Sequence, residues 1–292
     1  MELANLHAFM AITEYGSFSL AAEKLYLTQP AISKRIAQLE NELGVKLFDR
    51  IARGVQMTLA GQTLHQRSKQ ILQEVEDTRR AIASLTDTVS GQLLMGTSHH
   101  IALHRLPRYL KQYKENYPQV TLDLKFTDSE SGCKSVENGE LEFAVVTLPT
   151  VTRLPLKSIP LWKDELVIVI AADHPLSKIN NPGVSELLEY DAIMPEQSTF
   201  TWEIVHKKFE TEKSRVKVGL TSNYLETIKM LVSVGLGWSI LPKSMLVDSE
   251  LVMLTVNDIQ LSRTLGIVYH QNKTLSNAAR QFIDILTDKD IT

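Results

Sequence analysis

A group of polar and basic side chains opens a strongly helical stretch near the amino terminus: Gln29, Pro30, Ser33, Lys34 and Arg35. At the start of a helix that enters a DNA major groove, Lys and Arg contact phosphate or guanine, and Gln and Ser contact base edges. These residue types therefore predict recognition of double-stranded DNA. Adjacent amphipathic helices are also common in soluble proteins that bind no DNA, so the helical pattern alone leaves both interpretations open.

The apolar residues of the same stretch recur with the period of an α-helix and define its buried face: Ile32, Ile36, Leu39 and Leu43. Thr28 is a suitable N-cap, and Pro at the first turn costs no hydrogen bond. A shorter helix is expected over residues 18–25, and a first helix over residues 3–15 supports both. The two later helices, joined by a tight turn, form a predicted helix-turn-helix.

Residues 48–58 predict a small hairpin, or wing, that places Arg50 and Arg53 beside the helix-turn-helix. Such arginines suit contacts to phosphate or to the minor groove, although isolated exposed arginines are also common without a partner. The net charge of −3 argues against a chain that binds polyanions over its whole surface. Between Lys34 and Lys69, however, basic residues outnumber acidic ones, which is where DNA binding requires them.

Residues 59–89 predict one long helix with a narrow apolar seam of heptad spacing. A helix with a single narrow stripe needs a partner, and we expect a second copy of the chain to supply it. Packing of the seam along the chain's own C-terminal domain is the alternative. The residues expected at the dimer interface are Leu64, Ile71, Val75, Ile82 and Leu85.

From residue 90 onward, short apolar strands alternate with helices, for example a strand at 93–96, a helix at 101–117 and a strand at 166–172. This order predicts an α/β architecture with parallel sheets, and its length favours two lobes over one sheet. Ligands of such folds bind at the carboxyl ends of strands, beside helix N-termini that favour anions. Polar residues at these positions are the expected ligand contacts, although Ser and Thr also serve as plain N-caps: Ser98, His100, Ser129, Thr147, Ser198 and Thr201.

Several other classes are disfavoured. The sequence has one cysteine, Cys133, which excludes a disulfide within the chain and favours a cytoplasmic location. No secretory signal or apolar run long enough to span a membrane is found, so no membrane partner is expected. His99, His100 and His104 lack a neighbouring acidic or cysteine ligand in the sequence, so no metal is expected. No cofactor-binding or catalytic motif occurs, and an enzyme is not expected.

Residues 1–65 resemble the N-terminal domain of LysR-type transcriptional regulators. The resemblance is carried by FMAITEYGSFSLAAEKLYLTQPAISKRIAQLENELGVKLFDR, followed by TLAG at residues 58–61. It assigns the contacts to base and phosphate to Gln29, Pro30, Ser33, Lys34 and Arg35, and the wing arginine to Arg50. It also implies that the linker helix dimerises and that dimers pair into tetramers.

The resemblance further implies a winged helix-turn-helix at 1–58, a linker helix and hinge at 59–89, and an effector domain at 90–292 that is similar to periplasmic binding proteins. Lobe I is expected at about 90–161 and 266–292, and lobe II at about 162–265, with crossovers near 160–165 and 263–266. Ser129 matches a position where the family has an effector-contacting Ser or Thr. His100 stands where the family has another, which suggests a larger or more anionic ligand that is charge-paired near neutral pH.

The function expected from these observations is a ligand-responsive regulator of transcription that binds dyad operator DNA and a small, anionic effector. A small-molecule receptor or an enzyme that carries an accessory helix-turn-helix is the alternative. A purely architectural DNA-binding protein, which would bind no small molecule, is a third interpretation.

Overall fold

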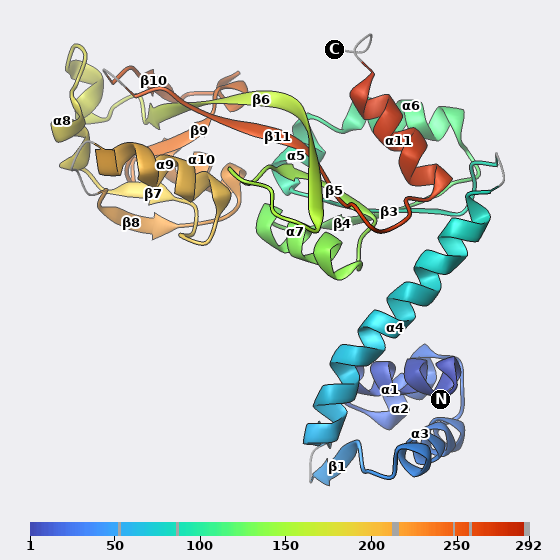
Figure 1. Ribbon diagram of the computed structural model, residues 1–292. Helices are drawn as coiled ribbons and strands as arrows, with labels where there is room; N and C mark the ends of the chain where they lie inside the picture. Colours follow the sequence, from blue (N-terminus) through green and yellow to red (C-terminus); the bar gives the residue numbers. More distant parts are fainter. Residues whose placement is uncertain (52–53, 86–87, 212–215, 248, 257–258, 289–292) are drawn as a thin grey trace. The chain divides into compact units, whose positions relative to one another are not determined.

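The computed structural model describes residues 1–51, 54–85, 88–211, 216–247, 249–256 and 259–288 (Figure 1). The chain divides into two compact units, Met1–Ile82 and Ala83–Thr292. Within the described ranges, no helix combines the length and the apolar character needed to cross a membrane.

The first unit contains the predicted helix-turn-helix and its wing. Its elements are α1 (Leu3–Tyr15), α2 (Phe18–Lys24), α3 (Gln29–Leu43), β1 (Phe48–Ile51), β2 (Gly54–Met57) and the long helix α4 (Leu59–Ala83). Strands β1 and β2 pair antiparallel, from Phe48 opposite Met57 to Ile51 opposite Gly54. The structure therefore confirms both the helix-turn-helix and the hairpin.

Local sequence signals set the ends of these helices. The Ser17 hydroxyl accepts a hydrogen bond from the N–H of Leu20, and the Thr28 hydroxyl accepts one from the N–H of Ala31, so both are N-caps. Gly44 ends α3 in the left-handed conformation. The apolar face of α3 packs with α1 and α2 in one core that includes Phe9, Ile32 and Leu39.

Helix α4 is shorter than predicted and has a partner within its own unit. It ends at Ala83, so Leu85 lies beyond the helix, in the turn that begins at Ser84. Leu64 and Ile71, on the predicted seam, pack against the core of the helix-turn-helix unit. A Cβ at Gly61 would lie 2.3 Å from the carbonyl oxygen of Leu47, so glycine permits this close approach of α4.

The second unit consists of two α/β lobes (Figure 1). Lobe I contains β3 (Gln92–Thr97), α5 (His99–His104), α6 (Pro107–Asn116), β4 (Thr121–Phe126), α7 (Ser129–Asn138), β5 (Phe143–Thr147) and α11 (Asn277–Thr287). Lobe II contains η1 (Pro175–Lys178), α8 (Val184–Leu188), β7 (Ala192–Met194), α9 (Phe200–Thr211), β8 (Val218–Thr221), α10 (Leu225–Ser233), β9 (Ser239–Pro242), η2 (Lys243–Leu246) and β10 (Val252–Leu254).

Two long strands, β6 (Leu156–Ile170) and β11 (Leu261–His270), pass through both lobes and pair antiparallel along their length. Strand β6 contributes Trp162 to the core of lobe I and Leu166 to a core of lobe II. Strand β11 likewise contributes Leu261 to lobe II and Leu265 to lobe I. The cores therefore meet between these residues, and β6 is twice as long as the strand expected at 166–172.

The sheet is mixed rather than parallel as predicted. Strand β3 is parallel to β4 and β5, whereas β11 is antiparallel to β5 and β6, and β9 and β10 are antiparallel to β6. Strand β11 pairs with β5 and β6, which lie far earlier in the sequence. The order of the strands along the chain does not predict such pairing. In lobe II, β7 and β8 form a separate parallel pair.

The helix predicted over 101–117 is wrong, because the structure has two helices with a break at Arg105 and Leu106. Pro107 lacks an N–H and cannot donate to the carbonyl of Leu103, so the chain starts a new helix with proline in its first turn. The break shortens α5, which carries the histidines that reach the space between the lobes.

Candidate functional site

The first candidate surface is the start of α3. Gln29, Pro30 and Lys34 are exposed there, whereas the opposite face of the helix is buried in the core of the unit. Ser33 and Arg35 are half-buried. The Arg35 guanidinium donates to the carbonyl oxygen of Ala4 at 3.5 Å, so this side chain also braces α1.

The turn before α3 exposes one further residue that the sequence patterns did not single out. Tyr26 has a positive φ of 53° and is 96% exposed, two residues before the N-cap of α3. The signal that identifies Tyr26 is structural: its aromatic ring is exposed in a tight turn. A positive φ is also unusual for an aromatic residue. The turn therefore adds an aromatic side chain with a phenolic hydroxyl to the surface at α3.

The structure describes only part of the wing. Arg50 lies in β1 opposite Val55, and the structure describes the backbone of this strand. Arg53 lies outside the described residues. Behind the wing, the Glu40 carboxylate accepts hydrogen bonds from Lys46 at 2.6 Å and from the Leu47 N–H at 2.9 Å. Burial raises the pKa of Glu40, but these two donors outweigh it and the net pKa is lowered.

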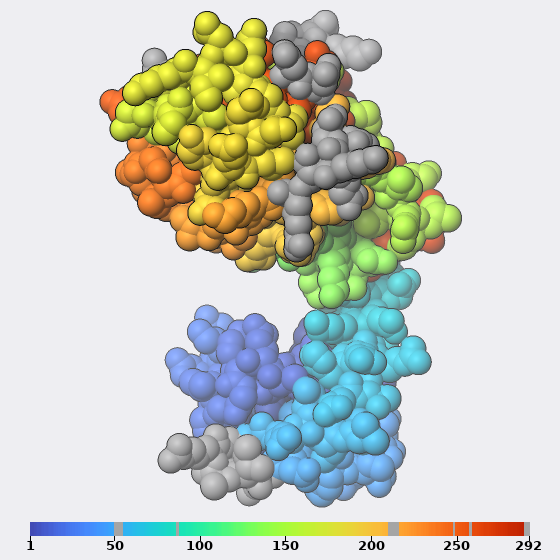
Figure 2. All heavy atoms as spheres, turned by 90° about the vertical axis from the view of Figure 1, so that its left-hand side faces the viewer, coloured from blue at the N-terminus to red at the C-terminus, as the bar shows by residue number. Residues whose placement is uncertain are grey.

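The second candidate site is a cavity of about 540 Å³ between the two lobes of the second unit. Figure 2 shows the yellow and orange atoms of lobe II beside the green atoms of lobe I. Five of the six predicted ligand residues line this cavity, namely Ser98, His100, Ser129, Thr147 and Thr201. Ser198 does not line it and is exposed, and its neighbour Thr199 lines the cavity instead.

Buried hydrogen bonds fix the polar wall of lobe I. The Ser129 hydroxyl accepts the N–H of Thr147 at 3.0 Å and so ties the start of α7 to the end of β5. The Glu130 carboxylate accepts the N–H of Phe200, which joins α7 to α9 of lobe II. Burial raises the pKa of Glu130, and the hydrogen bond from Phe200 opposes that effect.

Arg263 contributes a cation to the cavity, and its position as the third residue of β11 gave no sequence signal. Its Nε lies 2.9 Å from Oδ2 of Asp164, and its Nη1 lies 3.0 Å from the Thr201 hydroxyl. Arg105 approaches the other oxygen of Asp164 at 3.3 Å. Both Asp164 and Arg263 are buried, so this ion pair joins β6, β11 and α9 where the lobes meet.

His100 does not supply the positive charge that the sequence suggested. Burial, and the charge of Arg263, lower its pKa to about 4, so the ring is neutral near neutral pH. Neither ring nitrogen has a hydrogen-bond partner among the residues that the structure describes. His99 also lines the cavity, with its ring 5.6 Å from that of Phe126 and 5.1 Å from that of Tyr224.

Other cavity residues come from loops, and from the ends of strands and helices beside them, that the sequence analysis passed over. They share a position after a strand or at the start of a helix, as ligand-binding residues of α/β folds do: Phe126, Thr127, Asp128, Pro195, Glu196, Ser222, Asn223, Tyr224 and Leu225. The loop after β8 carries three polar or aromatic members of this set, which its place at a strand end could have indicated. The cavity therefore contains hydroxyls, an amide, carboxylates and one paired guanidinium.

The two units together define a class of protein, namely a two-lobed small-molecule receptor joined to a winged helix-turn-helix. Residues 3–62 match the family description "Bacterial regulatory helix-turn-helix protein, lysR family", and residues 86–290 match "LysR substrate binding domain". The chain belongs to the LysR family of transcriptional regulators, which bind operator DNA and small effectors. The sequence-based assignment to this family is confirmed.

Relatives agree with this assignment, and a solved structure agrees with the fold. A probable RuBisCO transcriptional regulator from Nostoc sp. strain PCC 7120 is 31% identical over 290 residues, which is 96% of this chain and 86% of that protein. An HTH-type regulator from Azotobacter vinelandii is 59% identical over 107 residues, which is 37% of this chain and 74% of that protein. Full-length CbnR in complex with its target DNA has a TM-score of 0.70 at 16% identity, covering 98% of this chain and 99% of that one. The two relatives are named as regulators of transcription and not as enzymes.

Proposed function

We propose that the protein reads operator DNA through the start of α3, with Gln29, Pro30, Ser33, Lys34 and Arg35 as the contact residues. The observation that supports this proposal is the division of α3 into a buried apolar face and an exposed polar face that is concentrated at its N-terminus. Helix N-termini of this kind meet base edges and phosphates in the major groove. Arg50 and Arg53 of the wing are proposed to contact phosphate or the minor groove.

We propose that pairs of chains present two such helices to a site with dyad symmetry. Within α4 the buried residues are Gly61 and Ser68, and Ile82 is 64% exposed. Leu64 and Ile71 already pack in the chain's own unit. The C-terminal part of the seam, with Val75 and Ile82, therefore contributes more to the proposed dimer interface than the N-terminal part does. Two chains related by a twofold axis would match a dyad operator, and pairing of dimers would give the tetramer.

We propose that the cavity between the lobes holds a small anionic effector that also carries hydrogen-bond donors. Helices α7, α9 and α10 begin at the cavity, and helix N-termini favour anions. Glu130 and Glu196 line the same cavity and favour donors on the ligand. An effector that contacts both lobes would favour their closed arrangement and shift the population of regulator states.

The experiment is fluorescence anisotropy of labelled duplex DNA with the full-length chain over a series of salt concentrations. Affinity should fall steeply with salt because phosphate contacts release counterions. Arg50→Ala should weaken binding on all sequences and make the salt dependence shallower by about one phosphate contact. Affinity that is independent of salt, or binding that Arg50→Ala leaves unchanged, would contradict the DNA-binding surface proposed for the wing.

The effector site is tested by a thermal-shift screen of small hydroxylated and amino carboxylates on the same chain. Ser129→Ala should reduce the shift caused by a ligand while DNA binding persists, because Ser129 lies in the second unit. Thr63→Ala, whose exposed hydroxyl bonds only within α4, serves as the control. Loss of DNA binding together with an unchanged ligand shift in Ser129→Ala would overturn the assignment.

A further inference from the structure

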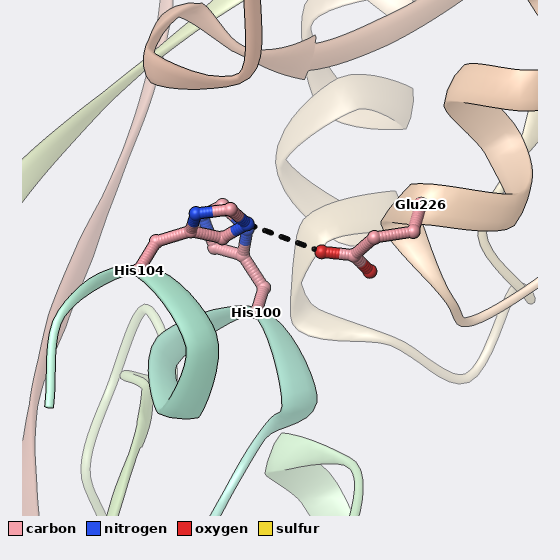
Figure 3. A group of neighbouring side chains, drawn as sticks. All are labelled: His100, His104 and Glu226. Atoms are coloured by element: carbon pink, nitrogen blue, oxygen red, sulfur yellow. Dashed lines mark hydrogen bonds and ion pairs between the residues drawn. The ribbon is translucent and has the colours of Figure 1, made fainter. Parts of the chain in front are cut away.

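Three side chains from two lobes converge on one point (Figure 3), and one of them, His100, also lines the cavity. His100 and His104 lie one turn apart on α5 of lobe I, and Glu226 projects from the first turn of α10 of lobe II. One ligand atom from each residue lies within 4.8 Å of the others. The sequence analysis dismissed a metal because no acidic residue is near these histidines in the sequence, and folding supplies one from more than a hundred residues away.

The geometry suits a single ion. His104 Nε2 and Glu226 Oε1 are 3.3 Å apart, which is about the spacing of two ligands on one tetrahedral zinc ion with bonds of about 2.1 Å. The rings of His100 and His104 have centroids 4.8 Å apart on the same face of α5. The three ligand atoms lie within 4.8 Å of one another, against about 3.4 Å for two ligands of one tetrahedral zinc ion, so side-chain movements of about 1 Å would complete the site.

The second observation is the state of His100. It is 4% exposed, and both ring nitrogens lack hydrogen-bond partners within the part of the chain that the structure describes. A buried polar ring without a partner costs free energy, so its retention calls for a ligand. Figure 3 shows this ring directed toward His104 and the carboxylate of Glu226.

The charges around the cluster permit a divalent cation. Glu226 contributes one negative charge, and Asp164 offsets the positive charge of nearby Arg263. Two imidazoles and one carboxylate are a borderline donor set that zinc and its neighbours among the divalent transition metals prefer to magnesium or calcium. Three protein ligands would leave a coordination position for water or for a donor atom of an effector.

We propose that His100, His104 and Glu226 form a binding site for a divalent transition-metal ion, of which Zn²⁺ is the best match, that links lobe I to lobe II. The ion can bind all three side chains only when α5 and α10 are close together. It therefore stabilises that arrangement of the lobes relative to arrangements in which the two helices are separated. The site itself is independent of the operator, whereas its effect on DNA affinity rests on the proposed function. In that role the metal acts as an effector or as a co-ligand of one.

The test uses the full-length, tag-free chain after removal of metal by a chelator. Isothermal titration with ZnCl₂ should give one site per chain, and CoCl₂ should give the visible ligand-field absorption of a low-symmetry Co²⁺ site. His104→Ala and Glu226→Gln change partly exposed side chains, so both variants should fold, and each should weaken metal binding at least about tenfold. His206→Ala, an exposed histidine on α9 outside the cluster, should bind metal as the wild type does.

Equal metal binding by the wild type, His104→Ala and Glu226→Gln would overturn the site, as would no binding by the wild type. Duplex-DNA binding by the metal-free wild type is measured on the same preparations. Absence of DNA binding both with and without ZnCl₂ would count against the proposed DNA-binding function and would leave the metal result unaffected. A DNA affinity that changes with ZnCl₂ in the wild type but not in Glu226→Gln would support the regulatory role.

Discussion

Replacement of Asp164 by Asn should destabilise the second unit more than any exposed substitution. Asp164 and Arg263 have side chains only 2% and 6% exposed, with 2.9 Å between Oδ2 and Nε. Asn has nearly the same shape but leaves the Arg263 charge buried without its counterion. Breaking a buried ion pair in this way costs about 3–5 kcal/mol. Arg105 is 29% exposed and can turn to water, so its share of the cost is small.

The chain offers a selective probe for this unit, because Trp162, Trp202 and Trp238 all lie in the effector-binding unit and the first unit has no tryptophan. Urea unfolding followed by tryptophan fluorescence therefore reports on the lobes alone. Asp164→Asn should lower the free energy of unfolding from this probe by about 3 kcal/mol or more. Thr201→Val, which removes only the neutral partner of Arg263, should lower it by about 1 kcal/mol.

The double variant Asp164→Leu with Arg263→Met tests whether the stability lost in Asp164→Asn is lost because the buried charge of Arg263 is left unpaired. Replacement of both partners by apolar side chains should recover most of the lost stability, because no buried charge remains. In a double-mutant cycle that compares this variant with its two single variants, the coupling free energy between positions 164 and 263 should then be at least about 2 kcal/mol. If Asp164→Asn unfolds at the same urea concentration as the wild type, or if the two effects simply add, the reasoning about this pair is wrong.

Three further predictions concern other parts of the chain. Because Lys46 and the Leu47 N–H lower the pKa of Glu40 below its ordinary value of 4.5, Glu40→Gln should destabilise the first unit by about 1–2 kcal/mol at pH 7. The difference in stability between the wild type and Glu40→Gln, followed by circular dichroism, should disappear as the pH falls through the lowered pKa of Glu40. A difference that persists at acid pH would contradict this prediction. Burial, with the carboxylates of Glu130 and Asp128, raises the pKa of Cys133 to about 12, so a disulfide exchange reagent at pH 8 should label it only after unfolding. Rapid labelling of the native chain would refute this. Ile82→Glu should shift the chain toward monomer in sedimentation analysis, whereas an exposed off-seam change, Arg79→Gln, should not.

The parts of the fold that depend on nearby residues were predictable from the sequence. The caps Ser17 and Thr28, the apolar period of α3 and the glycine that ends it are all local signals, and the helix-turn-helix follows from them. The break before Pro107 was also a local signal, but the apolar pattern on both sides of it suggested one helix. The length of β6 was not predictable, because its N-terminal half is defined by pairing with β11, about a hundred residues later.

The candidate site shows the same division. Ser98 and Ser129 follow strands and Thr147 ends one, so a rule about strand ends located them. Arg263 and Asp164 lie within strands, and only the register of β6 against β11 brings them opposite each other. Glu226 of lobe II lies 3.3 Å from His104 of lobe I, a contact across 122 residues that no spacing in the sequence encodes. The sequence therefore located loops that line the cavity but missed the charged residues that join the lobes.

In vitro selection from random duplex DNA with the full-length chain tests the central claim without knowledge of the target. Two recognition helices carried by paired chains should enrich sequences in which two half-sites are related by dyad symmetry. Enrichment of half-sites without symmetry, or recovery of no duplex above background at low salt, would contradict the account.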